Sequence, residues 1–124
     1  MVKKKVFVSF DFDNDHDLKG SLIKQAENPS SPFTLTDFSL KETQPEHQWL
    51  SRAQSAISRS DVFIVLLGNK THKAQGVLKE VQIAKGLRKP RFQLKPQGTN
   101  PEAVENAGPI VNWTWNKLKR MLSD

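Results

Sequence analysis

Short apolar runs alternate along the chain with amphipathic stretches. Residues 5–10 (KVFVSF) are β-branched and aromatic, which predicts a buried strand. Residues 15–26 follow with apolar side chains at helical spacing, and residues 33–38 alternate enough to predict a second strand. The chain therefore begins as a strand, a helix and a second strand.

A second helix and a central strand follow. Thr43 and Glu46 have the spacing of a capping box, which predicts that a helix begins there. Residues 62–67 are apolar without alternation, as expected of a parallel strand that is covered on both faces. The second helix would bury Trp49, Leu50, Ala53, Ala56 and Ile57.

The rest of the chain continues the same alternation. Its patterns predict helices at residues 76–87, 101–106 (a short one) and 113–122, and strands at residues 91–94 and 110–111. The whole order predicts an α/β fold: one domain over residues 1–124, as a flavodoxin-like three-layer sandwich with a five-stranded parallel sheet of order 2-1-3-4-5. In such sheets ligands bind outside the carboxyl ends of strands one and three, here the loops at residues 10–17 and 68–75.

One carboxylate interrupts an apolar helix face. At about 100° per residue, Val77, Val81, Ala84 and Leu87 share a side of the third helix, and Glu80 falls among them. Burial of an unpaired carboxylate costs several kcal/mol, roughly, so its presence needs a reason. One reason is a functional site; the other is a position in the first turn, where free N–H groups favour an acid.

Composition excludes several classes of chemistry. The chain has no cysteine, and His16, His47 and His72 lack ligand-like spacing, so we expect neither disulfides nor a metal site. The net charge is +6, but Lys and Arg are dispersed, and we rank a solubilising surface above nucleic-acid binding. The longest apolar run is too short to cross a membrane, so we expect a soluble, cytoplasmic protein.

Other uses of this fold lack their key residues. A phosphoacceptor receiver needs an aspartate at the end of strand three, where this chain has Leu66, Leu67 and Gly68. Residues 10–17 contain no glycine and are acidic, unlike a phosphate-binding loop. The serines show no recognisable arrangement with a histidine and an acid, which leaves serine hydrolysis without support.

Several motifs together resemble the TIR-like family, in particular the small bacterial and archaeal proteins of the Thoeris antiphage system. They are KVFVSF with the acidic loop after it, Asp37-Phe38-Ser39, the run ISRSDVFIVLLGNKT at residues 57–71, GVLKEV at residues 76–81 and AKGLRKP at residues 84–90. Many members have the pattern Trp-Val-x-x-Glu-Ile in the third helix. Val77 and Glu80 match that pattern, while Gly76 stands in place of the Trp.

The resemblance implies an enzyme that consumes NAD by cleaving the bond between nicotinamide and ribose, with NAD as substrate and no further cofactor. It implies Glu80 as the catalytic carboxylate. Nicotinamide leaves as a neutral base, so a single carboxylate that stabilises the developing positive charge can suffice. The substrate-binding residues that we expect are Phe10, Asp11, Phe12, Asp15, Ser39, Asn69, Thr71 and Gly76.

Two alternative functions also fit the sequence. Gly76 and the basic surface would also suit a non-catalytic TIR-like module that assembles with itself or with a separate effector protein. A nucleoside 2-deoxyribosyltransferase-like enzyme uses a similar sheet and a glutamate.

If NAD is the substrate, the attacking group determines the product. Attack by water gives ADP-ribose, while attack by an adenine nitrogen gives a cyclic ADP-ribose-type signal, which we favour for a lone domain. For the aromatic and acidic loop residues, core packing and helix capping are the alternatives to ligand contact.

Overall fold

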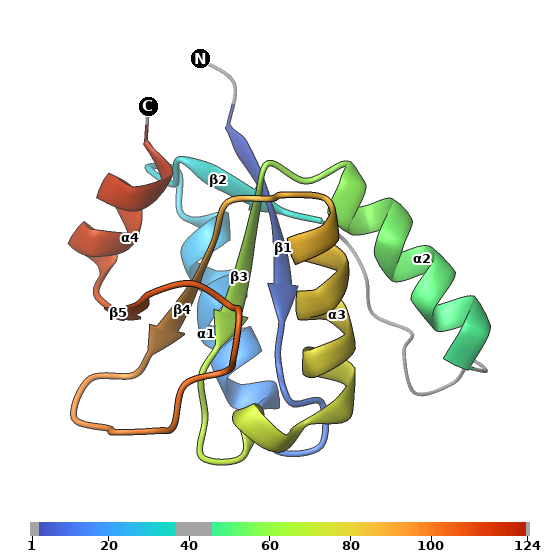
Figure 1. Ribbon diagram of the computed structural model, residues 1–124. Helices are drawn as coiled ribbons and strands as arrows, with labels where there is room; N and C mark the ends of the chain where they lie inside the picture. Colours follow the sequence, from blue (N-terminus) through green and yellow to red (C-terminus); the bar gives the residue numbers. More distant parts are fainter. Residues whose placement is uncertain (1–2, 37–45, 124) are drawn as a thin grey trace.

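The structure, a computed structural model, describes residues 3–36 and 46–123. It contains one parallel sheet with strands in the order β2-β1-β3-β4-β5 (Figure 1). This arrangement confirms the predicted α/β fold and its strand order. The strands are β1 (Lys4–Ser9), β2 (Phe33–Leu35), β3 (Val62–Leu66), β4 (Arg91–Lys95) and β5 (Ile110–Asn112).

In the described part of the chain, four α-helices cover the two faces of the sheet. Leu22 of α1 (His16–Glu27) and Leu118 of α4 (Trp115–Leu122) pack into one apolar cluster. Ile57 of α2 (Glu46–Ser58) and Val81 of α3 (Gln75–Gly86) pack into the other. The sheet therefore lies between two helical layers, and Figure 1 shows α2 and α3 side by side on one of them.

Strand β3 is the centre of the sheet, and all five of its residues are buried. Val62, Ile64 and Leu66 belong to the cluster with α1 and α4. Phe63 and Val65 belong to the cluster with α2 and α3. This division explains why the run is apolar without alternation: both of its faces lie in the core.

The predicted short helix at residues 101–106 is wrong, because residues 101–104 have no regular structure and residues 105–106 form a turn in the loop between β4 and β5. Gln93 of β4 holds the loop instead. Its Nε2 donates to the carbonyl oxygens of Val104 (3.1 Å) and Gly108 (2.8 Å), and its Oε1 accepts from the Val104 N–H (2.8 Å). The side-chain amide thus takes backbone groups that a helix would have paired within itself.

Smaller differences concern helix ends and exposed apolar residues. Leu87, expected to share the inner face of the third helix, lies just after the end of α3 and is 38 % exposed, and Ile23 of α1 is also 38 % exposed. Helix α4 begins at Trp115 because Thr114 caps it, accepting a hydrogen bond from the Lys117 N–H. Strand β2 ends at Leu35, and the Thr43 capping box lies outside the described residues.

No helix in the described ranges has the length and apolar character that a membrane crossing requires.

Candidate functional site

The loop after β1 is shaped by the carboxylate of Asp11. Its Oδ1 accepts from the Asp13 N–H (3.2 Å) and its Oδ2 accepts from Asn14 Nδ2 (2.7 Å). The Asp11 carbonyl oxygen also accepts from the Asp15 N–H (2.8 Å). Asp11 is buried, and its side chain therefore closes the turn that leads into α1.

Asp15 joins this loop to the loop after β3. It occupies the N-cap position of α1 but makes no side-chain capping bond. Its Oδ2 instead accepts from the Thr71 hydroxyl (3.1 Å), and Thr71 Oγ1 accepts from the Gly68 N–H (2.7 Å). A side chain on Gly68 would collide with the Asp15 carboxylate, which explains the glycine. The two predicted site residues Asp15 and Thr71 thus lie together.

The environment of Asp15 disfavours its charged form. Burial raises the pKa of the Asp15 carboxyl, and the nearby Asp11 and Asp17 raise it further. The hydrogen bond from Thr71 acts in the opposite direction. The net pKa lies above its usual value of 3.8.

Glu80 is buried against the end of β1. Only 2 % of it is exposed, and its Oε1 accepts a hydrogen bond from the Ser9 hydroxyl at 2.6 Å. Ser9 is itself fully buried and is the last residue of β1. The distance lies within the normal range of an O–H···O hydrogen bond, so the Ser9 hydroxyl fixes one oxygen of Glu80.

The first-turn explanation for Glu80 is wrong. Helix α3 begins at Gln75, one residue earlier than predicted, and a short 3-10 turn, η2 (Thr71–Lys73), leads into it. Glu80 is therefore in the second turn, beyond the reach of the free N–H groups at the helix start. Its tertiary contact with Ser9 accounts for part of its stabilisation.

Aromatic rings gather around the start of α1. The ring centroids of Phe10 and Phe12 are 5.7 Å apart, and His16 lies edge-on to Phe12 at 4.3 Å. Phe10 is 5 % exposed and belongs to the core cluster with α1, with Lys19 Nζ 5.1 Å from its ring. Phe12 is only partly buried, so of the two rings it is the accessible one.

A cavity of about 420 Å³ opens between the two loops. Residues 11–14 form one wall, and Lys70 with residues 73–76 forms the other. Gly76 lines it, whereas Glu80 is one helical turn farther along α3 and is not among the described lining residues. The cavity therefore opens at the carboxyl edge of β1 and β3, and the buried Ser9–Glu80 pair is not part of its described lining.

A larger cavity of about 820 Å³ lies elsewhere, over α2 and α3. Leu50, Leu78 and Ile83 supply its apolar lining, and residues 105–106 border it. It contains none of the predicted site residues. We regard the smaller cavity as the candidate site because it combines charged groups with the loops at the topological switch point.

The predicted substrate-binding residues do not all lie in one place. Asp11, Phe12 and Gly76 line the cavity, while Asp15 and Thr71 tie its two loops together. Asn69 is exposed on the second loop, and Phe10 is packed in the core. Ser39 lies outside the described residues.

Sequence reasoning missed Ser9 as a partner of Glu80. A signal existed: Ser9 follows Phe7 by two positions and so shares its side of the strand, and Phe7 packs against the layer of α2 and α3. A hydroxyl in that position, facing a helix with one inward carboxylate, suggests the pair. Lys70 and Lys73 were also not considered as site residues.

These features define the class of protein: an α/β domain of flavodoxin-like topology, with a polar cleft at the end of its first and third strands. The chain belongs to a TIR-like family, since the family model described as "Thoeris protein ThsB, TIR-like domain" matches residues 7–101. The predicted resemblance is thereby confirmed.

A solved structure supports the same fold. The CMP N-glycosidase BcmB of Clostridium botulinum is similar with a TM-score of 0.62 and 19 % identity, over 95 % of this chain and 97 % of that one. A comparison with curated protein sequences found no match.

Proposed function

We propose that this protein cleaves the N-glycosidic bond between nicotinamide and ribose in NAD, with Glu80 as the catalytic carboxylate. The observation that carries the proposal is the buried Glu80 beside the carboxyl edge of β1, oriented by the Ser9 hydroxyl at 2.6 Å. A fixed, desolvated carboxylate interacts strongly with a nearby positive charge. The reaction develops such a charge on the ribose.

The proposed reaction breaks the bond between the anomeric carbon and the pyridinium nitrogen. The electron pair of that bond goes to nicotinamide, which leaves as a neutral base and needs no general acid. The ribose carries oxocarbenium-like positive charge, which Glu80 stabilises. Water then adds to the anomeric carbon and loses a proton, giving ADP-ribose; attack by an adenine nitrogen of the same molecule would give a cyclic product.

Membership of the TIR-like family supports this proposal, because NAD cleavage is the activity that the resemblance implies. The similar fold of a CMP N-glycosidase supports N-glycosidic cleavage as the broader reaction class. It also makes a pyrimidine nucleoside monophosphate the second candidate substrate. Glu80 would stabilise the positive charge on the ribose with either substrate, but cytosine, unlike nicotinamide, needs a proton as it leaves, so cleavage of CMP also requires a proton donor.

The test is mass spectrometry of NAD and CMP incubated with wild type and with Glu80→Gln. We expect nicotinamide release by the wild type and a loss of turnover by about 100-fold or more in the variant, since glutamine keeps the hydrogen bond but not the charge. Glu27→Gln, an exposed acid at the end of α1, is the matched control and should keep full activity.

Unchanged turnover in a folded Glu80→Gln variant would contradict the catalytic role. Release of cytosine from CMP alone would favour the second substrate. No turnover with any nucleotide, combined with concentration-dependent self-association, would favour the assembly module instead.

A further inference from the structure

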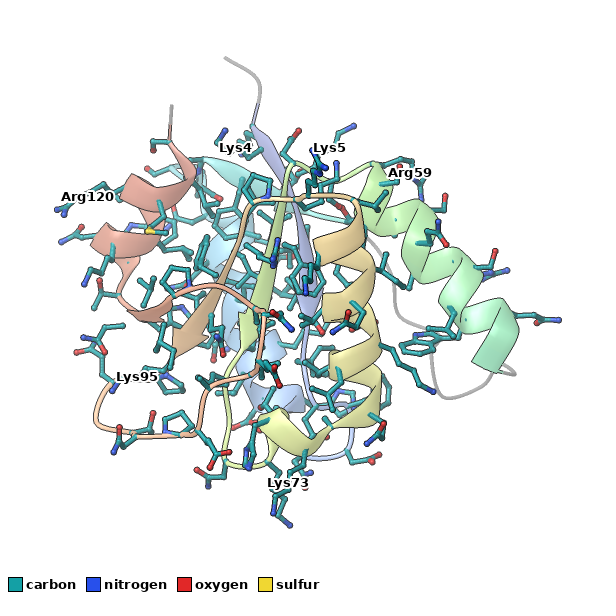
Figure 2. All side chains as sticks on the ribbon, in the orientation of Figure 1. Lys4, Lys5, Arg59, Lys73, Lys95 and Arg120 are labelled. Atoms are coloured by element: carbon teal, nitrogen blue, oxygen red, sulfur yellow. The ribbon has the colours of Figure 1, made fainter. Side chains whose placement is uncertain are left out.

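The wall of the 420 Å³ cavity formed by the loop after β3 carries two exposed cations, Lys70 and Lys73. Neither forms an ion pair with a carboxylate of residues 3–36 or 48–123. Figure 2 shows Lys73 at the η2 end of the molecule, whereas Lys4, Lys5 and Arg59 lie at the opposite end of the sheet. Lys73 therefore lies at the edge of the candidate site and apart from Lys4, Lys5 and Arg59.

The facing wall is polar and acidic, but its buried carboxylate, that of Asp11, already accepts hydrogen bonds. Both carboxylate oxygens of Asp11 accept hydrogen bonds within their own loop. Asp13 and Asn14 are exposed and line the cavity from the same side. The cavity thus offers ammonium donors on one side and carboxylate and amide groups on the other, and no ion pair joins the described residues that line its two walls.

A ligand that matches both walls needs an anion and neutral hydroxyl donors in one molecule. Phosphate oxygens accept charge-assisted hydrogen bonds from lysine ammonium groups, and sugar hydroxyls donate to carboxylates. A nucleotide carries both groups on one ribose, and a nucleoside carries only the hydroxyls. The cavity chemistry therefore favours a nucleotide.

The position along α3 fits the same ligand. Gly76 lines the cavity, and Glu80 lies four residues later on the same side of the helix, about 6 Å along its axis. A ribose placed between the cavity and Glu80 would have its phosphate beside the lysines and its glycosidic bond toward the carboxylate.

We propose that Lys70 and Lys73 form a phosphate subsite that selects nucleotides over nucleosides. This inference deepens the proposed function and rests on it for the position of the glycosidic bond. The evidence for the phosphate subsite is the pair of lysines and the cavity that they line. The start of α3 at Gln75 only adds further N–H donors on the same side. Asp13 is the expected partner of the sugar hydroxyls.

The test compares nicotinamide mononucleotide with nicotinamide riboside, which differ only in the 5′-phosphate. Binding is measured by calorimetry with the Glu80→Gln protein, so that the ligands persist. We expect the mononucleotide to bind about tenfold or more tightly than the riboside, the scale of one charge-assisted contact. Adding Lys70→Gln and Lys73→Gln should abolish this preference and leave riboside binding unchanged.

Lys85→Gln is the matched control, because Lys85 is an exposed lysine near the other end of the same helix. It should leave the preference intact. Equal binding of the two ligands, absence of mononucleotide binding, or a preference that survives the double lysine substitution would each overturn the subsite.

The two proposals fail in different ways. Wild-type cleavage of both nicotinamide compounds without a phosphate preference would refute the subsite and leave the proposed reaction intact. A lysine-dependent preference without cleavage by the wild type would support the subsite and refute the reaction.

Discussion

At the residue scale, the most informative contact is the bond between the Ser9 hydroxyl and the Glu80 carboxylate. Both residues are buried, and the bond connects the end of β1 to the second turn of α3. A buried acceptor that loses its donor costs about 1–3 kcal/mol, more if it is charged. Ser9 therefore serves stability and, in the proposed reaction, positions Glu80.

We expect Ser9→Ala to lower the free energy of unfolding by about 1–3 kcal/mol in urea denaturation. In the proposed reaction, the kcat for NAD should fall about tenfold in this variant. The KM should change little, because the serine orients the carboxylate and does not touch substrate. Ser9→Thr keeps the hydroxyl and should recover part of both losses. Ser58→Ala, at an exposed serine of α2, is the control; an unaltered kcat in Ser9→Ala would refute the positioning role.

Asp15 provides a prediction about pH. Its pKa is raised by burial, so the folded state holds its proton more tightly than the unfolded state does. Its contribution to stability is fully present below its unfolded pKa of 3.8 and is lost as pH rises through the raised folded value. Asparagine does not titrate, so Asp15→Asn lacks this pH-dependent loss of stability.

The measurement is urea denaturation of wild type and Asp15→Asn from about pH 3 to pH 7. The stability of the variant relative to wild type should increase with pH, because only the wild type loses the Asp15 contribution. A difference that stays constant over this range would show that the pKa of Asp15 is the same in both states.

At the element scale, the sequence predicted strands and helices well where packing repeats a local pattern. β3 is apolar throughout and buried throughout, and the inner stripe of α2 was placed correctly apart from the half-buried Leu50. The loop between β4 and β5 was mistaken in part for a helix, since its shape depends on Gln93, a distant residue on β4. The spacing of apolar residues in the loop does not reveal such a tertiary contact.

Gln93→Leu should destabilise the protein by about 3 kcal/mol, because it leaves the N–H and carbonyl of Val104 and the carbonyl of Gly108 without their partner. Urea denaturation measures the loss, and limited proteolysis should show faster cleavage within residues 96–109. Gln82→Leu, at an exposed glutamine of α3, is the control for the substitution itself. Equal stability of the two variants would mean that the amide does not hold the loop.

At the scale of the whole molecule, the sequence predicted the layers and the strand order, because alternating elements allow few right-handed parallel arrangements. It also predicted that the loops after β1 and β3 would meet, and Asp15 and Thr71 do meet there. It did not predict the partner of Glu80 or the two lysines of the cavity. Those depend on the exact rotation of α3 and on the 3-10 turn before it, which sequence periodicity does not specify.

The Ser9–Glu80 bond joins residues that are 71 positions apart. A chain that is still being synthesised has Ser9 long before it has Glu80, and then needs the turn and helix around residues 71–86 before the two can meet. The proposed active carboxylate therefore becomes oriented only late in biosynthesis. Fragments that end before α3 lack it entirely.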